Sequence, residues 1–149
     1  MYTIHIKKES ADVRTPKKAH SDDAAYDIYA YMPIKGFVVI APHQTVRIAT
    51  GLQMCPAKGY FISFRPRSGM AYKQNLIIAN TPATIDENYS GECMILLHNQ
   101  GNEIVTIQHD ERCAQMVLDK RRDVDFIETQ VLPNETSTRG ANGFGSSGK

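Results

Sequence analysis

Short runs in which apolar and polar residues alternate recur along most of the chain. Residues 2–7, for example, place Tyr2, Ile4 and Ile6 on one face. A period of two residues is typical of half-buried β-strands. Further strands are expected at residues 37–40, 45–50, 52–55, 60–64, 76–79, 92–98, 104–108, 113–118 and 124–130. Strand-length runs at this spacing, bounded by turn residues, predict an all-β sandwich or barrel.

Helices have little support in the sequence. No window of a dozen residues keeps a clean period of about 3.6, and Pro or Gly interrupts most candidates. The best short helix is expected at residues 68–73, with Ser68 as its N-cap. Residues from 133 onward look detached from the core, so we expect a β domain at 1–132 followed by a flexible C-terminal arm at 133–149.

Composition narrows the class of protein. The chain has 149 residues, 42% of them hydrophobic, and a formal net charge of +1. This describes a single globular domain, and the near-neutral charge argues against binding to nucleic-acid backbones. The sequence has no signal-peptide pattern and no apolar run of membrane-spanning length, so we expect a cytoplasmic protein. Three widely spaced cysteines favour reduced, buried thiols over a zinc site or a disulfide framework.

Four polar clusters interrupt the strand pattern, at residues 22–27, 65–69, 80–92 and 112–116. The first contains Asp27, a carboxylate that could order the waters of Mg²⁺ beside substrate phosphates. The alternative interpretation of this first cluster is a turn whose charged side chains are solvated. The second combines Arg67, Ser68 and Gly69, which together offer donors to an anion, although a plain structural turn is the alternative.

The third cluster places Asp86 directly after the apolar Ile85, in a predicted hairpin between two hydrophobic strands. A partly desolvated carboxylate there could serve as a general base for water, whereas the blander alternative is a solvated hairpin tip. The fourth, with Arg112 and Gln115, says little by itself. Arginines, isolated acids and a glycine-rich C-terminus favour phosphate handling over acyl transfer.

The C-terminal residues 143–149, GFGSSGK, contain most of a P-loop. A true P-loop continues into Ser or Thr and a helix that holds phosphate at its N-terminus. We therefore expect a mobile arm that brings backbone N–H groups and hydroxyls to a site built elsewhere. The alternative is a passive tail.

Five segments stand out along the chain: 24–28 (AAYDI), 66–71 (PRSGMA), 79–93 (with its Ile85-Asp86, Tyr89 and Gly91), 111–116 (ERCAQM) and 139–148 (RGANGFGSSG). Taken together and in order, they resemble the five motifs of the trimeric dUTP pyrophosphatase (dUTPase) family. Each motif alone is weak, but five in this order at sensible spacing are highly specific.

The resemblance implies a distorted jelly-roll of the β-clip type, assembled as a homotrimer with active sites at subunit interfaces. It also implies hydrolysis of dUTP to dUMP and pyrophosphate, with Mg²⁺ as cofactor. Such an enzyme limits uracil in DNA and supplies dUMP for dTMP synthesis.

The resemblance also implies roles for individual residues. Asp86 would activate the water that attacks the α-phosphorus, and Asp27 would contact Mg²⁺ through its waters. Tyr89 would pack against the deoxyribose and block a 2′-hydroxyl. The residues expected to bind the phosphates are Arg67, Ser68, Gly69 and Gln115, and those expected to contact the uracil side are Asn80, Thr84, Ile85 and Met94. From the arm, the resemblance implies contacts by Arg139, Phe144, Gly145, Ser146 and Ser147, with Phe144 stacked on the base.

The sequence departs from the commonest family pattern at Ala25, Met70, Ala83, Thr84 and Asn88. None of these departures removes a catalytic side chain, but Ala83 and Thr84 lie in the hairpin expected to read uracil. A dCTP deaminase of the same superfamily is the nearest rival, and ammonia release from dCTP would identify it. A binding module, such as a β-barrel for single-stranded nucleic acid or a scaffold for protein contacts, is the second rival.

Overall fold

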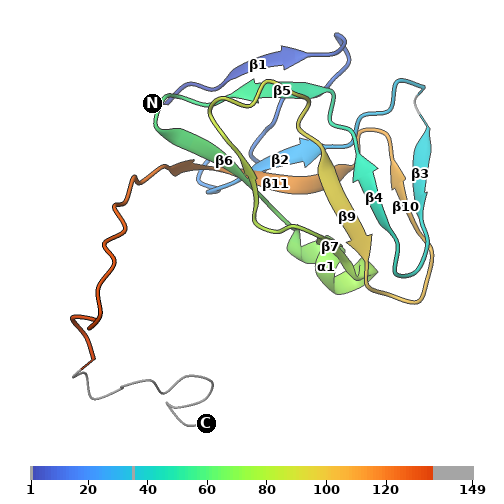
Figure 1. The fold of residues 1–149 in the computed structure, drawn as a ribbon. Helices are drawn as coiled ribbons and strands as arrows, with labels where there is room; N and C mark the ends of the chain where they lie inside the picture. Colours follow the sequence, from blue (N-terminus) through green and yellow to red (C-terminus); the bar gives the residue numbers. More distant parts are fainter. Residues whose placement is uncertain (1, 35, 136–149) are drawn as a thin grey trace.

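The computed structural model describes residues 2–34 and 36–135, and within them the chain is almost entirely β. The elements are β1 (His5–Lys8), β2 (Tyr26–Tyr29), β3 (Phe37–Ile40), β4 (Thr45–Ile48), β5 (Leu52–Cys55), β6 (Tyr60–Arg65), α1 (Ser68–Gln74), β7 (Leu76–Ile78), β8 (Ala83–Ile85), β9 (Ile95–Asn99), β10 (Val105–Gln108) and β11 (Arg112–Lys120). Figure 1 shows how the strands gather into one body with the single helix at its margin. The predicted all-β, jelly-roll-like fold with one short helix is confirmed.

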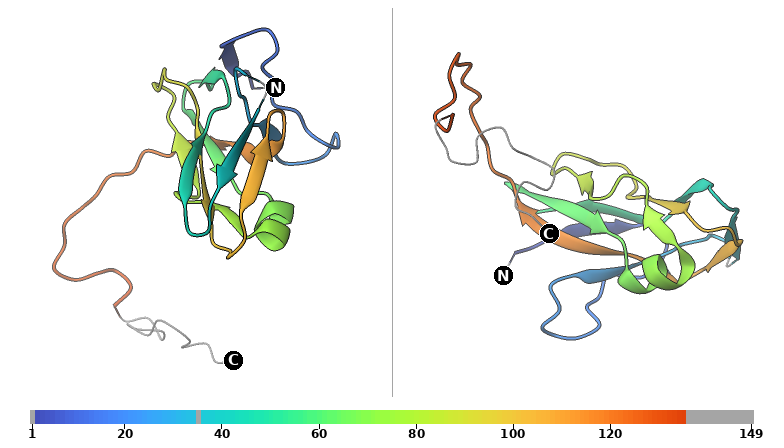
Figure 2. Two further views of the ribbon diagram at one scale, coloured as in Figure 1. Left: turned by 90° about the vertical axis from the view of Figure 1, so that its right-hand side faces the viewer. Right: turned by 90° about the horizontal axis from the view of Figure 1, so that it is seen from below.

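The strands form small antiparallel sheets that share one core. The largest has the order β2-β11-β6-β8, a second has the order β4-β9-β7, and two pairs are β1-β5 and β10-β3. Neighbours in these sheets are often far apart in sequence, as with β2 and β11. Figure 2 shows the same layers from the side and from below.

The core lies between these sheets. Strand β6 buries Ile62, Ser63 and Phe64 in succession, so both of its faces are covered. Strand β9 instead buries alternate residues, in the period of two expected of a strand with one face inward. Its last inward residue, Asn99, is fully buried, and its side chain donates to the Ile40 carbonyl at 3.1 Å. The buried side-chain amide of Asn99 is thus hydrogen-bonded, as buried polar groups usually are.

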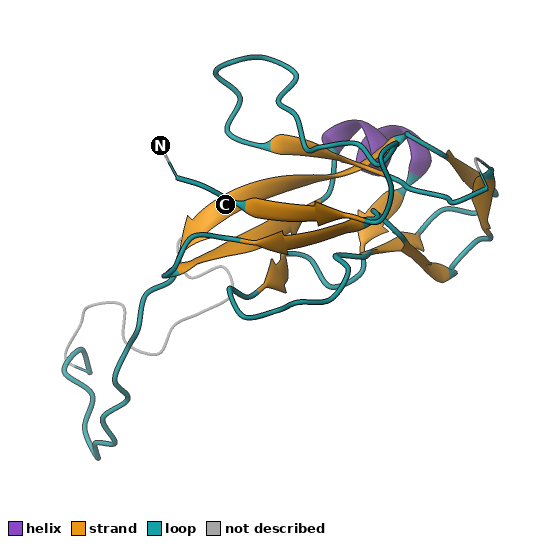
Figure 3. Ribbon diagram, turned by 90° about the horizontal axis from the view of Figure 1, so that it is seen from above, coloured by secondary structure: helices purple, strands orange, loops and turns teal. Residues whose placement is uncertain are grey.

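Helix α1 packs beside β7, on the outside of the strands (Figure 3). It begins at Ser68, and its N-cap is Arg67, which makes no side-chain capping bond. The prediction of Ser68 as N-cap is wrong, because Arg67 keeps extended backbone angles and the helix starts directly after it. The helix ends at Gln74, and the next residue, Asn75, is its C-cap: its φ of 53° and the bond from its N–H to the Met70 carbonyl are typical of a helix C-terminus.

The predicted strand at residues 124–130 is absent from the structure. Residues 121–135 run away from the sheets without pairing to any described strand, as Figures 1 and 2 show. Phe126 is 95% exposed and Ile127 is 86% exposed. The alternating pattern is present, but a strand also needs a partner for its backbone groups, and the described chain offers none.

The described residues contain no helix with the length and apolar character needed to cross a membrane. The three cysteines are free thiols. Cys93 and Cys113 are buried as expected, but Cys55 is exposed because it ends β5 at the edge of a two-stranded sheet, so the expectation of buried thiols is wrong there.

Candidate active site

The first cluster of site residues forms where β2 and β11 pair beside β6. The strand register places Asp27 opposite Gln115, and Gln115 opposite Arg65. Asp27 lies within β2 and is 6% exposed, although a carboxylate is rarely buried without partners. Its partners are two arginines that arrive from different elements.

Arg67 and Arg112 share the two oxygens of Asp27. Arg112 Nη1 donates to Oδ2 at 3.3 Å, and Arg67 Nε lies 3.2 Å from Oδ1. The Arg67 Nε–H is buried without a hydrogen-bond acceptor in its direction, so its contact with Oδ1 is an ion pair. Arg67 Nη1 also donates to the Arg112 carbonyl at 3.2 Å. Two guanidinium groups on one carboxylate leave a net positive charge, which is suited to attract an anion.

Ser68 and Gly69 follow Arg67 and are both exposed at the start of α1. The space around Gly69 is open, because a Cβ added there would meet no atom within 4 Å. Positive side chains and free backbone N–H groups therefore lie together at this end of the large sheet.

The second cluster is the hairpin that follows β8. Strand β8 pairs with β6, with Ile85 opposite Ile62 and Thr84 opposite Ser63. Asp86 comes directly after the strand and is exposed, so it is not desolvated in a single chain. Its backbone carbonyl accepts a hydrogen bond from the Tyr89 N–H at 3.2 Å, which closes the turn.

Tyr89 folds back over Gly91. Its hydroxyl donates to the Glu92 carbonyl at 3.1 Å. A Cβ at position 91 would lie 2.4 Å from the Tyr89 hydroxyl oxygen. The Tyr89 ring can therefore keep its place only if residue 91 is a glycine. Glu92 then fixes the far end of the hairpin, because its Oε1 accepts from the Thr50 N–H at 3.0 Å and from the Gly51 N–H at 2.7 Å.

The buried cysteines are unsuited to nucleophilic catalysis. Burial raises the pKa of the Cys93 thiol to about 11 and that of the Cys113 thiol to about 12. The thiolate is the reactive form, so both groups stay protonated and inert near neutral pH. Neither of these two buried thiols is therefore a candidate nucleophile.

Comparison with known proteins identifies the family. A sequence model of the dUTPase family matches residues 11–148. The chain belongs to the dUTPase family. The deoxyuridine 5′-triphosphate nucleotidohydrolase of Bdellovibrio bacteriovorus is 46% identical over 150 residues, covering 98% of this chain and 96% of that protein. The enzyme of the same name from Fusobacterium nucleatum is 36% identical over 144 residues, covering 97% of this chain and 94% of that protein.

The fold agrees with the sequence comparison. The dUTPase of Staphylococcus bacteriophage 80alpha, solved with dUPNHPP, superposes with a TM-score of 0.85 at 27% identity and covers 99% of both chains. This dUTPase-family chain is therefore an enzyme with the jelly-roll-like fold of its relatives.

Within one chain of this dUTPase-family protein, the predicted site residues fall into two groups. The first lies where β2, β11 and the start of α1 meet, and contains Asp27, Arg67, Ser68, Gly69 and Gln115. The second lies along and around the β8 hairpin, and contains Asn80, Thr84, Ile85, Asp86, Tyr89 and Met94. No hydrogen bond or ion pair between described residues joins the two groups. The predicted arm residues Arg139, Phe144, Gly145, Ser146 and Ser147 lie outside the described residues.

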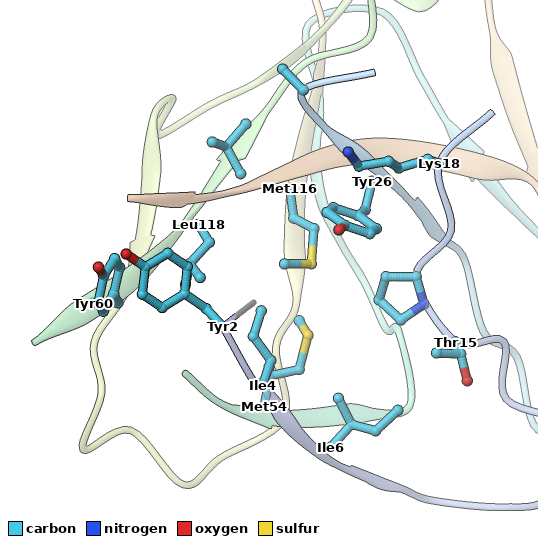
Figure 4. Close-up of a pocket in the computed structure, with 13 residues that line it drawn as sticks. Tyr2, Ile4, Ile6, Thr15, Lys18, Tyr26, Met54, Tyr60, Met116 and Leu118 are labelled. Atoms are coloured by element: carbon cyan, nitrogen blue, oxygen red, sulfur yellow. The ribbon is translucent and has the colours of Figure 1, made fainter. Parts of the chain in front are cut away.

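Two cavities lie near these elements. One, of about 500 Å³, is lined by Thr84, Asp86, Glu87 and Arg121 among others. The other, of about 530 Å³, has an apolar floor that includes Ile4, Met54 and Met116 and is shown in Figure 4. This second cavity contains none of the predicted site residues, so its size does not make it the active site.

Sequence reasoning missed the residues that hold the site together. Arg112 had no assigned role, yet it is one of the two partners of Asp27. Glu92 closes the polar cluster 80–92 and has no role of its own in the sequence prediction, yet it anchors the hairpin. Acids and arginines at strand ends are a weak signal, because most such residues are solvated.

The described residues contain no group of three or more His, Cys, Asp or Glu that could hold a metal ion. Asp27 suits an indirect contact with Mg²⁺ through water rather than direct coordination, because both of its oxygens already face guanidinium groups. A metal held mainly by substrate phosphates and water suits such a site, because Mg²⁺ needs few protein ligands.

Proposed function

We propose that this chain hydrolyses dUTP to dUMP and pyrophosphate, and that Asp86 is the general base. The observation that carries the proposal is the position of Asp86, exposed at the end of β8 in a hairpin that is fixed at its far end by Glu92. The names of the relatives above state this activity for those proteins. An exposed carboxylate on a fixed turn can hold a water for in-line attack.

The proposed reaction is a single displacement at the α-phosphorus. Asp86 accepts a proton from water as the water oxygen bonds to phosphorus. The bond from the α-phosphorus to the α–β bridging oxygen breaks, and its electron pair leaves with pyrophosphate. Phosphoryl-transfer chemistry of this kind depends on positioning and charge neutralisation more than on covalent catalysis.

The Asp27–Arg67–Arg112 cluster supports a phosphate site. Asp27 neutralises one of the two guanidinium charges and leaves the other available to the triphosphate. Ser68, Gly69 and Gln115 would add donors nearby. Mg²⁺, with Asp27 reaching only its waters, would supply further neutralisation of the triphosphate charge when bound.

The hairpin supports a site for the nucleoside. Tyr89, held over Gly91, offers one flat face to the deoxyribose. Asn80, Thr84, Ile85 and Met94 would face the uracil, and the backbone there would exclude a 5-methyl group. A 2′-hydroxyl would meet the Tyr89 ring.

We further propose a homotrimer whose sites lie between subunits. The Asp27–Arg67–Arg112 cluster and the Asp86 hairpin make no polar contact with each other among the described residues of one chain. Each could therefore complete the site of a neighbouring subunit across an interface. The exposed apolar residues Val124, Phe126 and Ile127 support such an assembly, because exposed clusters of this kind mark interaction surfaces.

The C-terminal arm completes the proposal. Arg139, Ser146 and Ser147 would contact the γ-phosphate, Gly145 would lie beside them, and Phe144 would stack on the base. The enzyme would act in the cytoplasm, where it limits uracil in DNA and provides dUMP.

The substrate is tested by mixing the protein with Mg²⁺ and each of dUTP, dTTP, UTP and dCTP, and by measuring pyrophosphate. Release from dUTP alone is expected. Ammonia from dCTP would instead identify a deaminase, and no turnover of any nucleotide would favour a scaffold used for protein contacts.

A further inference from the structure

The carboxylate of Glu87, the residue next to Asp86, joins three segments that are distant in sequence. The Gly59 N–H donates to Glu87 Oε2 at 2.5 Å. Arg121 Nη1 lies 3.0 Å from Glu87 Oε1. The Arg121 N–H donates in turn to the Gly59 carbonyl at 2.8 Å, which closes a ring of contacts that we call the Glu87 clip.

Each member of the clip lies at an element boundary. Gly59, with φ at +79°, forms the turn between β5 and β6, a backbone conformation that favours glycine. Arg121 is the first residue after β11, where the chain leaves the sheets. Glu87 follows β8 by two residues. The clip therefore ties the Asp86 hairpin to the end of β11, where the C-terminal segment begins.

Asp86 depends on its backbone for its position. Its side chain makes no hydrogen bond or ion pair with any described residue. Pairing of β8 with β6 fixes the chain up to Ile85, and the clip fixes the chain at Glu87. Both sides of Asp86 are thus held, although the carboxylate itself is free to meet water.

The two contacts of Glu87 are unequal. The ion pair with Arg121 is partly exposed, with side-chain exposures of 47% for Arg121 and 28% for Glu87, and such pairs contribute little. The bond from the Gly59 N–H is charge-assisted and short, and such bonds are the stronger kind. The same bond is the main cause that lowers the pKa of Glu87, with Arg121 adding to it.

We propose that Glu87 is a positioning residue for Asp86, which acts by holding the hairpin against the Gly59 turn and the end of β11. The inference rests on the proposed role of Asp86 as general base. Loss of the clip lets the hairpin backbone shift, and a shift of about 1 Å at a reacting group can cost about 10²-fold in rate. A more modest loss is expected here, because β8 and the Glu92 anchor remain.

The test compares Glu87→Ala with Glu87→Gln, which keeps the length and an acceptor for the Gly59 N–H. Glu103→Ala, at an exposed acid between β9 and β10, is the matched control. For each variant, kcat and KM for dUTP, the dissociation constant of an imido-bridged non-hydrolysable dUTP analogue and the melting temperature are measured.

We expect kcat of Glu87→Ala to fall by about tenfold, with analogue binding within about twofold of wild type. Glu87→Gln should lose less, and Glu103→Ala should match wild type. If Glu87→Ala does not fold, Glu87→Gln and Arg121→Lys carry the test, with a smaller fall in kcat expected in each.

Unchanged kcat in the folded Glu87 variants would overturn the inference while leaving the proposed function intact. A fall in kcat matched by equal weakening of analogue binding, or by loss of folded protein, would show a merely structural role. A wild-type protein that releases no pyrophosphate from dUTP would instead remove the proposed function itself.

Discussion

Asp27 is a buried carboxylate whose partners both carry positive charge. Removing its charge leaves Arg67 and Arg112 close together without a counter-ion. We expect Asp27→Asn to lower the free energy of unfolding by about 2–4 kcal/mol, since breaking a buried pair is costly. Urea unfolding at fixed protein concentration measures this change.

Asp119→Asn is the matched control, because Asp119 pairs with Arg65 in an exposed contact at 3.3 Å. Its loss should cost no more than about 1 kcal/mol. Equal effects of the two substitutions would mean that the Asp27 cluster contributes no more than an ordinary surface pair.

The Glu87 clip predicts that the stability of the fold depends on pH. The Gly59 N–H holds the pKa of Glu87 below its ordinary value, so the charged carboxylate stabilises the fold above that ordinary value. The stabilisation is lost as the pH falls through the lowered pKa. The melting temperature of wild type should exceed that of Glu87→Gln at neutral pH, and the gap should close below about pH 4. A gap that persists in strong acid would contradict the assignment.

At the scale of elements, the strand predictions succeeded where the pattern and the turns agreed. Residues 37–40 and 52–55 are strands β3 and β5 with the predicted bounds. The short strand β8 was not predicted, because three residues are too few to show a period. Residues 124–130 have the pattern of a strand but no partner in the described chain, and pairing cannot be deduced from one segment alone.

The sequence predicted which site residues lie near one another better than it predicted the contacts that hold them, and their roles stay predictions. Neighbouring residues of a motif stay together, so Arg67, Ser68 and Gly69 were easily placed as one cluster. Contacts between distant segments, such as Arg112 with Asp27, depend on strand register, which the sequence does not specify residue by residue.

The segment after β11 carries a prediction about assembly. Phe126 contributes nothing to the core of one chain, because it is 95% exposed. Phe126→Ser should therefore leave the subunit folded and shift the proposed trimer toward smaller species. Ile34→Ser, at another highly exposed apolar residue, should leave the assembly unchanged.

Sedimentation equilibrium gives the mass of each variant, and circular dichroism reports the fold. An unchanged mass for Phe126→Ser would show that the segment after β11 is not part of the proposed subunit interface.

At the scale of the whole molecule, the C-terminal arm is expected to act on a site built elsewhere. Deleting residues 139–149 should leave a folded assembly and lower turnover by about 10²-fold or more, because preorganised phosphate contacts are lost. Steady-state pyrophosphate release and the assembly mass are measured together. An unaffected rate would make the arm a passive tail.

The central claim concerns Asp86, and the most direct measurement is pyrophosphate release from dUTP by Asp86→Asn. The substitution keeps the shape and removes the base, so turnover should be abolished. Binding of the non-hydrolysable dUTP analogue should survive, since the side chain serves the water rather than the ligand. Glu103→Gln, at an exposed acid between β9 and β10, should behave as wild type. Near-normal pyrophosphate release by Asp86→Asn would contradict the account.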